Sequence, residues 1–192
     1  MKTPQELMRF SKTISYALRH HPEDFGLELD SDGSVAVSEL LKGISEKKGQ
    51  TYTEEDLKAS LEIPGKKRFV IEGSRIRAYY GHSIKKEVIR PEIEPPELLF
   101  HATSRKALPS ILEQGLSPMS RQHVHLASTK KTALDAGLRR DSFPPLLVVR
   151  SREAWKDGIR FFQGNEDIFL SDPIPPGYIT VCLQHDKSDK ET

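Results

Sequence analysis

A pair of adjacent prolines near the middle of the chain is the feature that most constrains its fold. The stretch EIEPPELL (residues 92–99) lies between two halves that each carry their own hydrophobic pattern. Proline fixes φ and donates no backbone hydrogen bond, so neither a regular helix nor a central strand runs through this point. A chain of 192 residues has room for two small lobes. We therefore predict lobes over residues 1–94 and 95–184, followed by a polar tail over 185–192.

The composition excludes several classes of protein. The single cysteine, Cys182, excludes an intramolecular disulfide framework and a multi-cysteine zinc site, and we expect it to be buried and inert. No apolar run approaches the roughly 20 residues that span a bilayer, and MKTPQELMRF lacks a signal-peptide core. We expect a cytoplasmic protein without a membrane partner.

Charge is balanced overall but uneven along the chain. The whole sequence holds 29 basic and 28 acidic side chains, so no global field points to a polyanionic partner. Residues 66–90, however, hold eight basic and two acidic side chains, and residues 121–152 hold seven and two. Charge alone is compatible with a patchwork surface and with a focused anion-binding site.

The first lobe combines helices with a basic hairpin. Thr3, Pro4 and Glu6 form a capping signal for a helix that ends before Pro22, and shorter helices are predicted over about 38–47 and 54–62. RFVIE and RIRAYY flank Gly73-Ser74, which predicts a two-residue hairpin in which Ile71 faces Ile76 and Val70 faces Arg77. Helices followed by such a hairpin indicate a winged-helix-like module.

The second lobe alternates between strands and helices. LLFHATS, HVHLAS, LLVVRS, RFFQ, DIFL and YITVCL are typical of strands, and helices are predicted over 104–114 and from Thr129 to about Arg140. Neither GxGxxG nor GxxxxGK[ST] occurs, so a nucleotide bound here does not use those loops. The chain as a whole is predicted to be α+β, with a mixed α/β second lobe.

A few cationic residues are candidates for chemistry. Arg19 and His20 lie at the end of the first helix, where they serve either as an anion-and-proton site or only as cations that complement the helix dipole. Arg68, Arg77 and Arg121 are either solvated surface residues or convergent phosphate ligands. His101 and His125 lie in strand-like runs and are neighbours if those strands pair. They lack further ligands at zinc spacing, so we expect no metal.

Several stretches of the sequence together resemble the RNA 2′-phosphotransferase family, and they occur in the order and at about the spacing of that family. The resemblance spans nearly the whole chain and rests on ISYALRHHPE (14–23), KKRF (66–69), IRAYYGHS (76–83), LLFHATS (98–104), ILEQGLSPMSRQHVHLAS (111–128) and FLSDPIPPGYI (169–179). It implies a winged-helix-like N-terminal lobe that binds RNA and a C-terminal lobe of the ADP-ribosyltransferase type. It also implies NAD⁺ as a consumed co-substrate.

The resemblance further implies a reaction and a set of site residues. An RNA 2′-phosphate of the tRNA-splicing type is removed through an ADP-ribosylated 2′-phospho-RNA, which releases nicotinamide, 2′-hydroxyl RNA and ADP-ribose 1″,2″-cyclic phosphate. Because Arg121 follows the proline pair, we expect it to reach the catalytic site from the second lobe, and we expect a monomer. The residues carried over are Arg19, His20, Arg68 and Arg121 for catalysis, His101, Ala102, Thr103, His125 and Leu126 for NAD⁺, and Arg77 and His82 for RNA.

Two departures from the family pattern lie in the second lobe, and two other functions stay open. Ala102 replaces the usual glycine beside His101, and an acidic residue, Asp167, replaces another glycine. The alternatives are an ADP-ribosyltransferase that acts on terminal phosphates of RNA or DNA, and a non-catalytic RNA-binding module.

Overall fold

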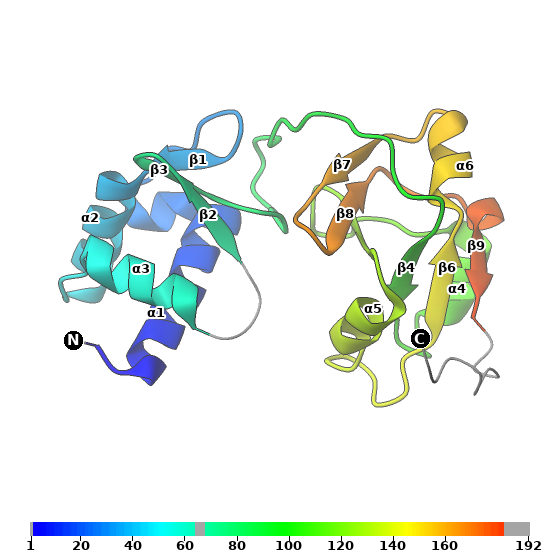
Figure 1. Cartoon of the computed structure of the whole chain (residues 1–192), viewed down its shortest axis with the longest axis horizontal. Helices are drawn as coiled ribbons and strands as arrows, with labels where there is room; N and C mark the ends of the chain where they lie inside the picture. The colour runs from blue at the N-terminus through cyan, green and yellow to red at the C-terminus, as the bar shows by residue number, and fades with distance from the viewer. Residues whose placement is uncertain (1, 64–67, 183–192) are drawn as a thin grey trace. The chain divides into compact units, whose positions relative to one another are not determined.

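The computed structural model describes residues 2–63 and 68–182 and divides the chain into two units. Unit 1 contains the described residues up to Arg90 together with Ser120–Gln122; unit 2 contains Pro91–Met119 and the described residues from His123 onward. The described part of the chain is mixed α/β, with two antiparallel sheets and six α-helices (Figure 1). The polar tail predicted over 185–192, and residues 66–67 of KKRF, lie outside the described residues.

Unit 1 packs helices against a small antiparallel sheet whose strand order is β1-β3-β2. Its elements are α1 (Pro4–Arg19), the 3-10 helix η1 (Pro22–Phe25), β1 (Ser34–Ala36), α2 (Val37–Lys48), α3 (Glu54–Glu62), β2 (Phe69–Glu72) and β3 (Arg75–Ala78). Helices α1 and α3 begin at capping boxes: the Thr3 and Thr53 side chains accept hydrogen bonds from the backbone N–H groups of Glu6 and Asp56. The three predicted helices are confirmed.

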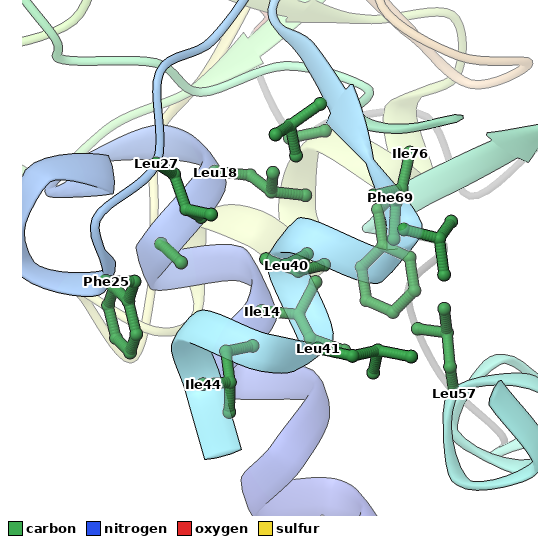
Figure 2. Packing of buried hydrophobic residues seen from close by; sticks show 14 of the residues in the cluster. Ile14, Leu18, Phe25, Leu27, Leu40, Leu41, Ile44, Leu57, Phe69 and Ile76 are labelled. Carbon is green, nitrogen blue, oxygen red and sulfur yellow. The ribbon is translucent and has the colours of Figure 1, made fainter. Parts of the chain in front are cut away.

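The predicted hairpin register is also confirmed. Ile71 lies opposite Ile76 and Val70 opposite Arg77, because the two-residue loop fixes the pairing. Alternation then turns Phe69 and Ile76 toward the helices, where both are almost fully buried. Figure 2 shows these two side chains packed with residues of α1, α2 and α3, including Ile14, Leu40 and Leu57. This core holds the end of α1 against the hairpin, and so positions the residues of the first candidate site.

Unit 2 is built on a six-stranded antiparallel sheet with the order β7-β8-β5-β4-β6-β9. Its elements are β4 (Leu99–Ala102), α4 (Leu108–Gln114), β5 (Val124–Ala127), α5 (Lys130–Gly137), β6 (Leu146–Val149), α6 (Ser151–Lys156), β7 (Phe161–Gln163), β8 (Ile168–Ser171), the 3-10 helix η2 (Pro176–Tyr178) and β9 (Ile179–Val181). All six predicted strands are present. Helix α5 contacts β4, β5 and β6, so it covers the middle of the sheet (Figure 1).

Four details of unit 2 differ from the prediction. Helix α4 begins at Leu108 instead of residue 104, because Ser104 first forms a turn that accepts the Ala107 backbone N–H. Helix α5 ends at Gly137, and α6 was not predicted. Cys182 is half-buried rather than buried, and it packs beside Ala127 and Leu146.

Neither a membrane span nor a metal cluster is found in the described part of the chain. No helix there is both long and apolar enough to cross a bilayer. Likewise, no group of three or more His, Cys, Asp or Glu side chains there is arranged to hold a metal ion.

Candidate functional site

Arg19 is the centre of the first candidate site, in unit 1. It is the last residue of α1, and its Nη2 donates a hydrogen bond of 2.7 Å to the backbone oxygen of Arg68. Its Cζ lies 5.5 Å from the centroid of the Tyr80 ring, a cation–π geometry. Its Nε is buried and has no hydrogen-bond partner among the described residues. A buried donor of this kind is costly to leave unsatisfied, which points to a ligand that accepts from it.

The electrostatics around Arg19 are dominated by like charge. The pKa of Arg19 is lowered to about 10, mainly by burial; the charges of Arg68 and Arg121 add to the lowering, and Tyr80 opposes it. Arg19 remains protonated at neutral pH, and two further arginines lie within electrostatic range of it. Such a cluster is suited to a dianion, because guanidinium forks bind phosphate oxygens bidentately.

His20 follows Arg19 directly and is oriented by Ser83. Its Nδ1 lies 2.8 Å from Ser83 Oγ, while the Ser83 backbone N–H donates to the Arg19 oxygen at 2.9 Å. The pKa of His20 is lowered first by burial and then by the charges of Arg19, Arg121 and His21. The imidazole is therefore neutral at neutral pH, in the protonation state that accepts a proton.

Arg121 belongs to unit 1, although the sequence led us to expect it in the second lobe. The reason is Gln122, which makes four hydrogen bonds to the segment after β3. Its backbone N–H donates to His82 O at 3.0 Å, and its Nε2 donates to Ile84 O at 3.1 Å and Lys86 O at 2.8 Å. Its Oε1 accepts from the Val88 backbone N–H at 3.2 Å. Arg121 is thus fixed in the unit that carries Arg19.

The two residues singled out for RNA differ in accessibility. Arg77 lies on the sheet face away from the core, where its Nη2 donates to Glu72 Oε1 at 2.9 Å. His82 is only 3% exposed, and its Nε2 would lie 3.3 Å from a Cβ on Gly33, whose φ of +79° disfavours any side chain. The structure therefore leaves the His82 ring little surface with which to touch a ligand.

In unit 2 the two histidines are neighbours, as expected if their strands pair. β4 and β5 are antiparallel partners, and His101 Nδ1 lies 3.0 Å from the backbone oxygen of His125. A carbonyl oxygen only accepts, so Nδ1 carries the proton and Nε2 is an acceptor in the neutral ring. The pKa of His101 is lowered mainly by burial and also by Arg140, while the bond to His125 opposes the shift.

The extra methyl of Ala102 points away from His101. Successive side chains of a strand alternate between faces, and Ala102 packs with the α5 residues Ala133 and Leu134. A Cβ placed on Gly137 of α5 would lie only 2.7 Å from the Ala102 Cβ. The departure from the family glycine is therefore accommodated by a glycine on the helix.

The remaining candidates of unit 2 lie near the same strands. Thr103 is 7% exposed, and its backbone N–H donates to Pro145 O at 3.1 Å. The Leu126 side chain is 1% exposed and belongs to the core. Asp167 is exposed in the turn before β8, and its backbone oxygen accepts from Ser128 at 2.9 Å.

Sequence reasoning missed two residues that position the candidate catalytic groups. Ser83 holds the ring of His20, and Gln122 fixes the backbone beside Arg121. Both occur in stretches that carried the family resemblance, next to or one residue beyond a candidate site residue. That adjacency is the one sequence signal that pointed to them.

Comparisons with known proteins identify the relatives of this chain. The model of the RNA 2′-phosphotransferase, Tpt1/KptA family matches residues 5–173. A "Probable RNA 2′-phosphotransferase" of Acetivibrio thermocellus is 46% identical over 172 residues, which cover 89% of this chain and 94% of the relative. Similar proteins of the same name from Bacillus thuringiensis and Thermococcus kodakarensis are 43% and 37% identical, over 89% and 93% of this chain and 93% and 98% of their own lengths.

Proposed function

This chain belongs to the RNA 2′-phosphotransferase, Tpt1/KptA family of enzymes, and on that premise we propose that it removes an internal RNA 2′-phosphate with NAD⁺ as a consumed co-substrate. The products are nicotinamide, RNA with a 2′-hydroxyl group, and ADP-ribose 1″,2″-cyclic phosphate. The co-substrate supplies an electron-poor ribose carbon that takes the phosphate as nicotinamide leaves.

The observation that carries this proposal is the gathering of Arg68 and Arg121 around Arg19 in unit 1, with His20 within range of Arg19 and Arg121. Transfer of a phosphate dianion is mainly a matter of positioning and charge neutralisation. Three guanidinium groups offer both, and the buried Nε of Arg19 offers a donor to a phosphate oxygen.

His20 is proposed to take the proton of the ribose hydroxyl that attacks phosphorus. A neutral ring is required, and the lowered pKa of His20 supports it. For Nε2 to accept the proton, Nδ1–H must donate, and Ser83 Oγ at 2.8 Å is the acceptor that fits. Ser83 can thus stabilise the tautomer that His20 needs, since its hydroxyl oxygen accepts from Nδ1–H.

Unit 2 is proposed to hold NAD⁺ around His101 and His125, with Ala102, Thr103 and Leu126 beside them. The fit rests on His101, whose Nδ1–H is committed to the His125 oxygen and whose Nε2 is an acceptor for a ribose hydroxyl. Because the Ala102 methyl packs on α5, it does not crowd the face of the strand that carries His101.

The folds and RNA contacts that we propose are assigned to the two units separately. Three helices and the β2–β3 hairpin support a winged-helix-like unit 1, and the six-stranded sheet supports an ADP-ribosyltransferase-type unit 2. Arg77 is proposed to contact RNA directly. His82 instead positions the segment that carries Arg121, since its backbone oxygen accepts from Gln122.

The test is a reaction with a short RNA that carries one internal 2′-phosphate, with and without NAD⁺. We expect 2′-hydroxyl RNA and ADP-ribose 1″,2″-cyclic phosphate in equal amounts, only when NAD⁺ is present. A folded protein that yields neither product refutes the proposal. A stable ADP-ribose adduct on a terminal phosphate indicates the alternative transferase activity instead.

A further inference from the structure

Phe143 is an aromatic side chain that the fold leaves in solvent. It lies in the segment between α5 and β6 and is 75% exposed. Phenylalanine is normally buried, since its transfer out of water is among the most favourable of all side chains. An exposed ring indicates a binding site only if neighbouring residues hold it in place and also offer contacts to a ligand.

Asp141 holds this ring and an arginine in one arrangement. Its Oδ1 accepts from the Phe143 backbone N–H at 3.0 Å and from Arg105 Nη2 at 2.9 Å. Its Oδ2 accepts from the Arg105 backbone N–H at 2.9 Å and from Arg105 Nε at 3.2 Å. These bonds hold the pKa of Asp141 far below its ordinary value, so the carboxylate is charged at every physiological pH.

The result is an exposed cation–π pair in which the Arg105 guanidinium lies over one face of the Phe143 ring. Arg105 Cζ lies 5.8 Å from the centroid of the Phe143 ring, and the Arg105 side chain is 65% exposed while that of Asp141 is 9% exposed. Phenyl and guanidinium faces are the two surfaces on which nucleobases stack in proteins. The carboxylate, which is half-buried, fixes both, and this lowers the entropy lost when a ligand stacks on them.

This pair lies beside the strand end that carries the proposed NAD⁺ ligands. The Thr103 backbone N–H donates to Pro145 O at 3.1 Å, which ties the Phe143 segment to the residue after β4. Arg140, in the same segment, lies within electrostatic range of His101. A dinucleotide whose ribose meets His101 carries its second base on a flexible pyrophosphate, next to this basic segment.

We propose that Phe143 and Arg105 form a stacking subsite for the adenine ring of NAD⁺, with Asp141 as the residue that positions both. This inference rests on the proposed function, since it assumes that NAD⁺ is bound in unit 2. It assigns the recognition of the adenine end to a segment outside the stretches that carried the family resemblance.

The experiment compares the affinities of ADP-ribose and nicotinamide mononucleotide, which lacks adenine, for the full chain and its variants. Phe143→Ala is expected to weaken ADP-ribose binding about tenfold and leave mononucleotide binding unchanged. Phe143→Tyr is expected to restore the affinity for ADP-ribose. Leu138→Ala, which removes another exposed apolar side chain of the same region, is the matched control and should change neither affinity.

A spectroscopic readout reports the stacking itself. The chain has one tryptophan, Trp155, so the variant Phe143→Trp adds a single new fluorophore at the subsite. We expect adenosine monophosphate to quench the added emission and to leave the emission of the unsubstituted chain unchanged.

Each outcome separates the subsite from the function on which it rests. A chain that binds ADP-ribose and releases nicotinamide from NAD⁺, but whose Phe143→Ala variant binds ADP-ribose equally well, contradicts the subsite alone. A folded chain that binds neither ADP-ribose nor NAD⁺ contradicts the proposed function together with the subsite. Weaker binding of 2′-phosphorylated RNA at unchanged ADP-ribose affinity contradicts the proposal and assigns the ring to an RNA base.

Discussion

His20 Nδ1 lies 2.8 Å from Ser83 Oγ, and this contact couples the end of α1 to the segment that follows β3. The same serine donates its backbone N–H to the Arg19 oxygen, so the position of the ring and the end of the helix are fixed together. A side chain that acts through His20 in this way is expected to influence the rate more than the binding of substrate.

Ser83→Ala should lower kcat about two- to tenfold with little change in KM. A loss of this size corresponds to one hydrogen bond that orients a base. The measurement is steady-state removal of the 2′-phosphate, together with the pH profile of kcat. Ser83→Thr retains the hydroxyl and should restore most of the rate. An equal loss in the Ala and Thr variants would assign Ser83 a packing role only.

Replacing His20 or Arg68 by alanine should stall the second chemical step, so ADP-ribosylated RNA should accumulate. Loss of a group of this kind costs about 2–4 kcal/mol of barrier, or tens to hundreds of fold in rate. Single-turnover assays with labelled RNA separate the two steps. Arg9→Ala removes an exposed arginine of the same helix and should leave both steps unchanged. If both steps slow equally in the His20 and Arg68 variants, the assignment of roles is wrong.

The pH dependence of the rate should reflect the lowered pKa of His20. A base must be neutral. We therefore expect kcat to stay high as the pH is lowered from neutral to 6.5, the ordinary pKa of histidine, and to decline only below that pH. Arg121→Met removes one of the charges that lower this pKa. The acid limb of that variant's residual activity should therefore move to higher pH, whereas a limb that stays in place argues against His20 as the base.

Stability should decrease on the acid side because His101 is held neutral in the fold. A group whose pKa is lowered by folding binds more protons in the unfolded chain than in the folded one. Its contribution to the free energy of unfolding is therefore complete above the unfolded pKa of about 6.5. That contribution is lost as the pH falls through the folded pKa. Urea unfolding between pH 7.5 and 5 should show a steeper decline for the unsubstituted chain than for His101→Gln. Parallel curves would contradict the linkage.

The contact between Ala102 and Gly137 should appear as an energetic coupling. Gly137→Ala places a methyl 2.7 Å from the Ala102 Cβ and 2.8 Å from the Pro144 Cβ, and such overpacking costs about 1–3 kcal/mol. Ala102→Gly removes one of the two clashes, so the double variant should be more stable than the sum of the single changes allows. Additive changes in the free energy of unfolding would mean that the helix shifts instead.

Much of unit 1 was predictable because its signals are local. The capping boxes at Thr3 and Thr53 and the Gly73-Ser74 loop fixed helix starts and hairpin register without tertiary information. Helix ends in unit 2 were less predictable. Ser104 formed a turn before α4, and α5 ended at Gly137, where an added Cβ would meet Ala102 of β4.

The candidate site was predictable in its residues but not in its construction. Arg19 and His20 adjoin in sequence, and the hairpin brings in Arg68. The placement of Arg121 depends on the hydrogen bonds of Gln122, which join residues more than 30 positions apart. No pattern within either half of the sequence encodes such long-range bonds, so the proline pair alone suggested the wrong unit for Arg121.

The assignment of Ser120–Gln122 to unit 1 means that the chain leaves this unit at Arg90 and returns to it thirty residues later. A fragment cut at the proline pair would keep Arg19 and Arg68 and lose the third guanidinium, along with the four bonds that fasten it. The boundary that the proline pair suggests therefore differs from the boundary of the unit that carries the arginine cluster. If the N-terminal half were fused to another protein, it would carry its helices and hairpin with it, but its cluster of arginines would be incomplete.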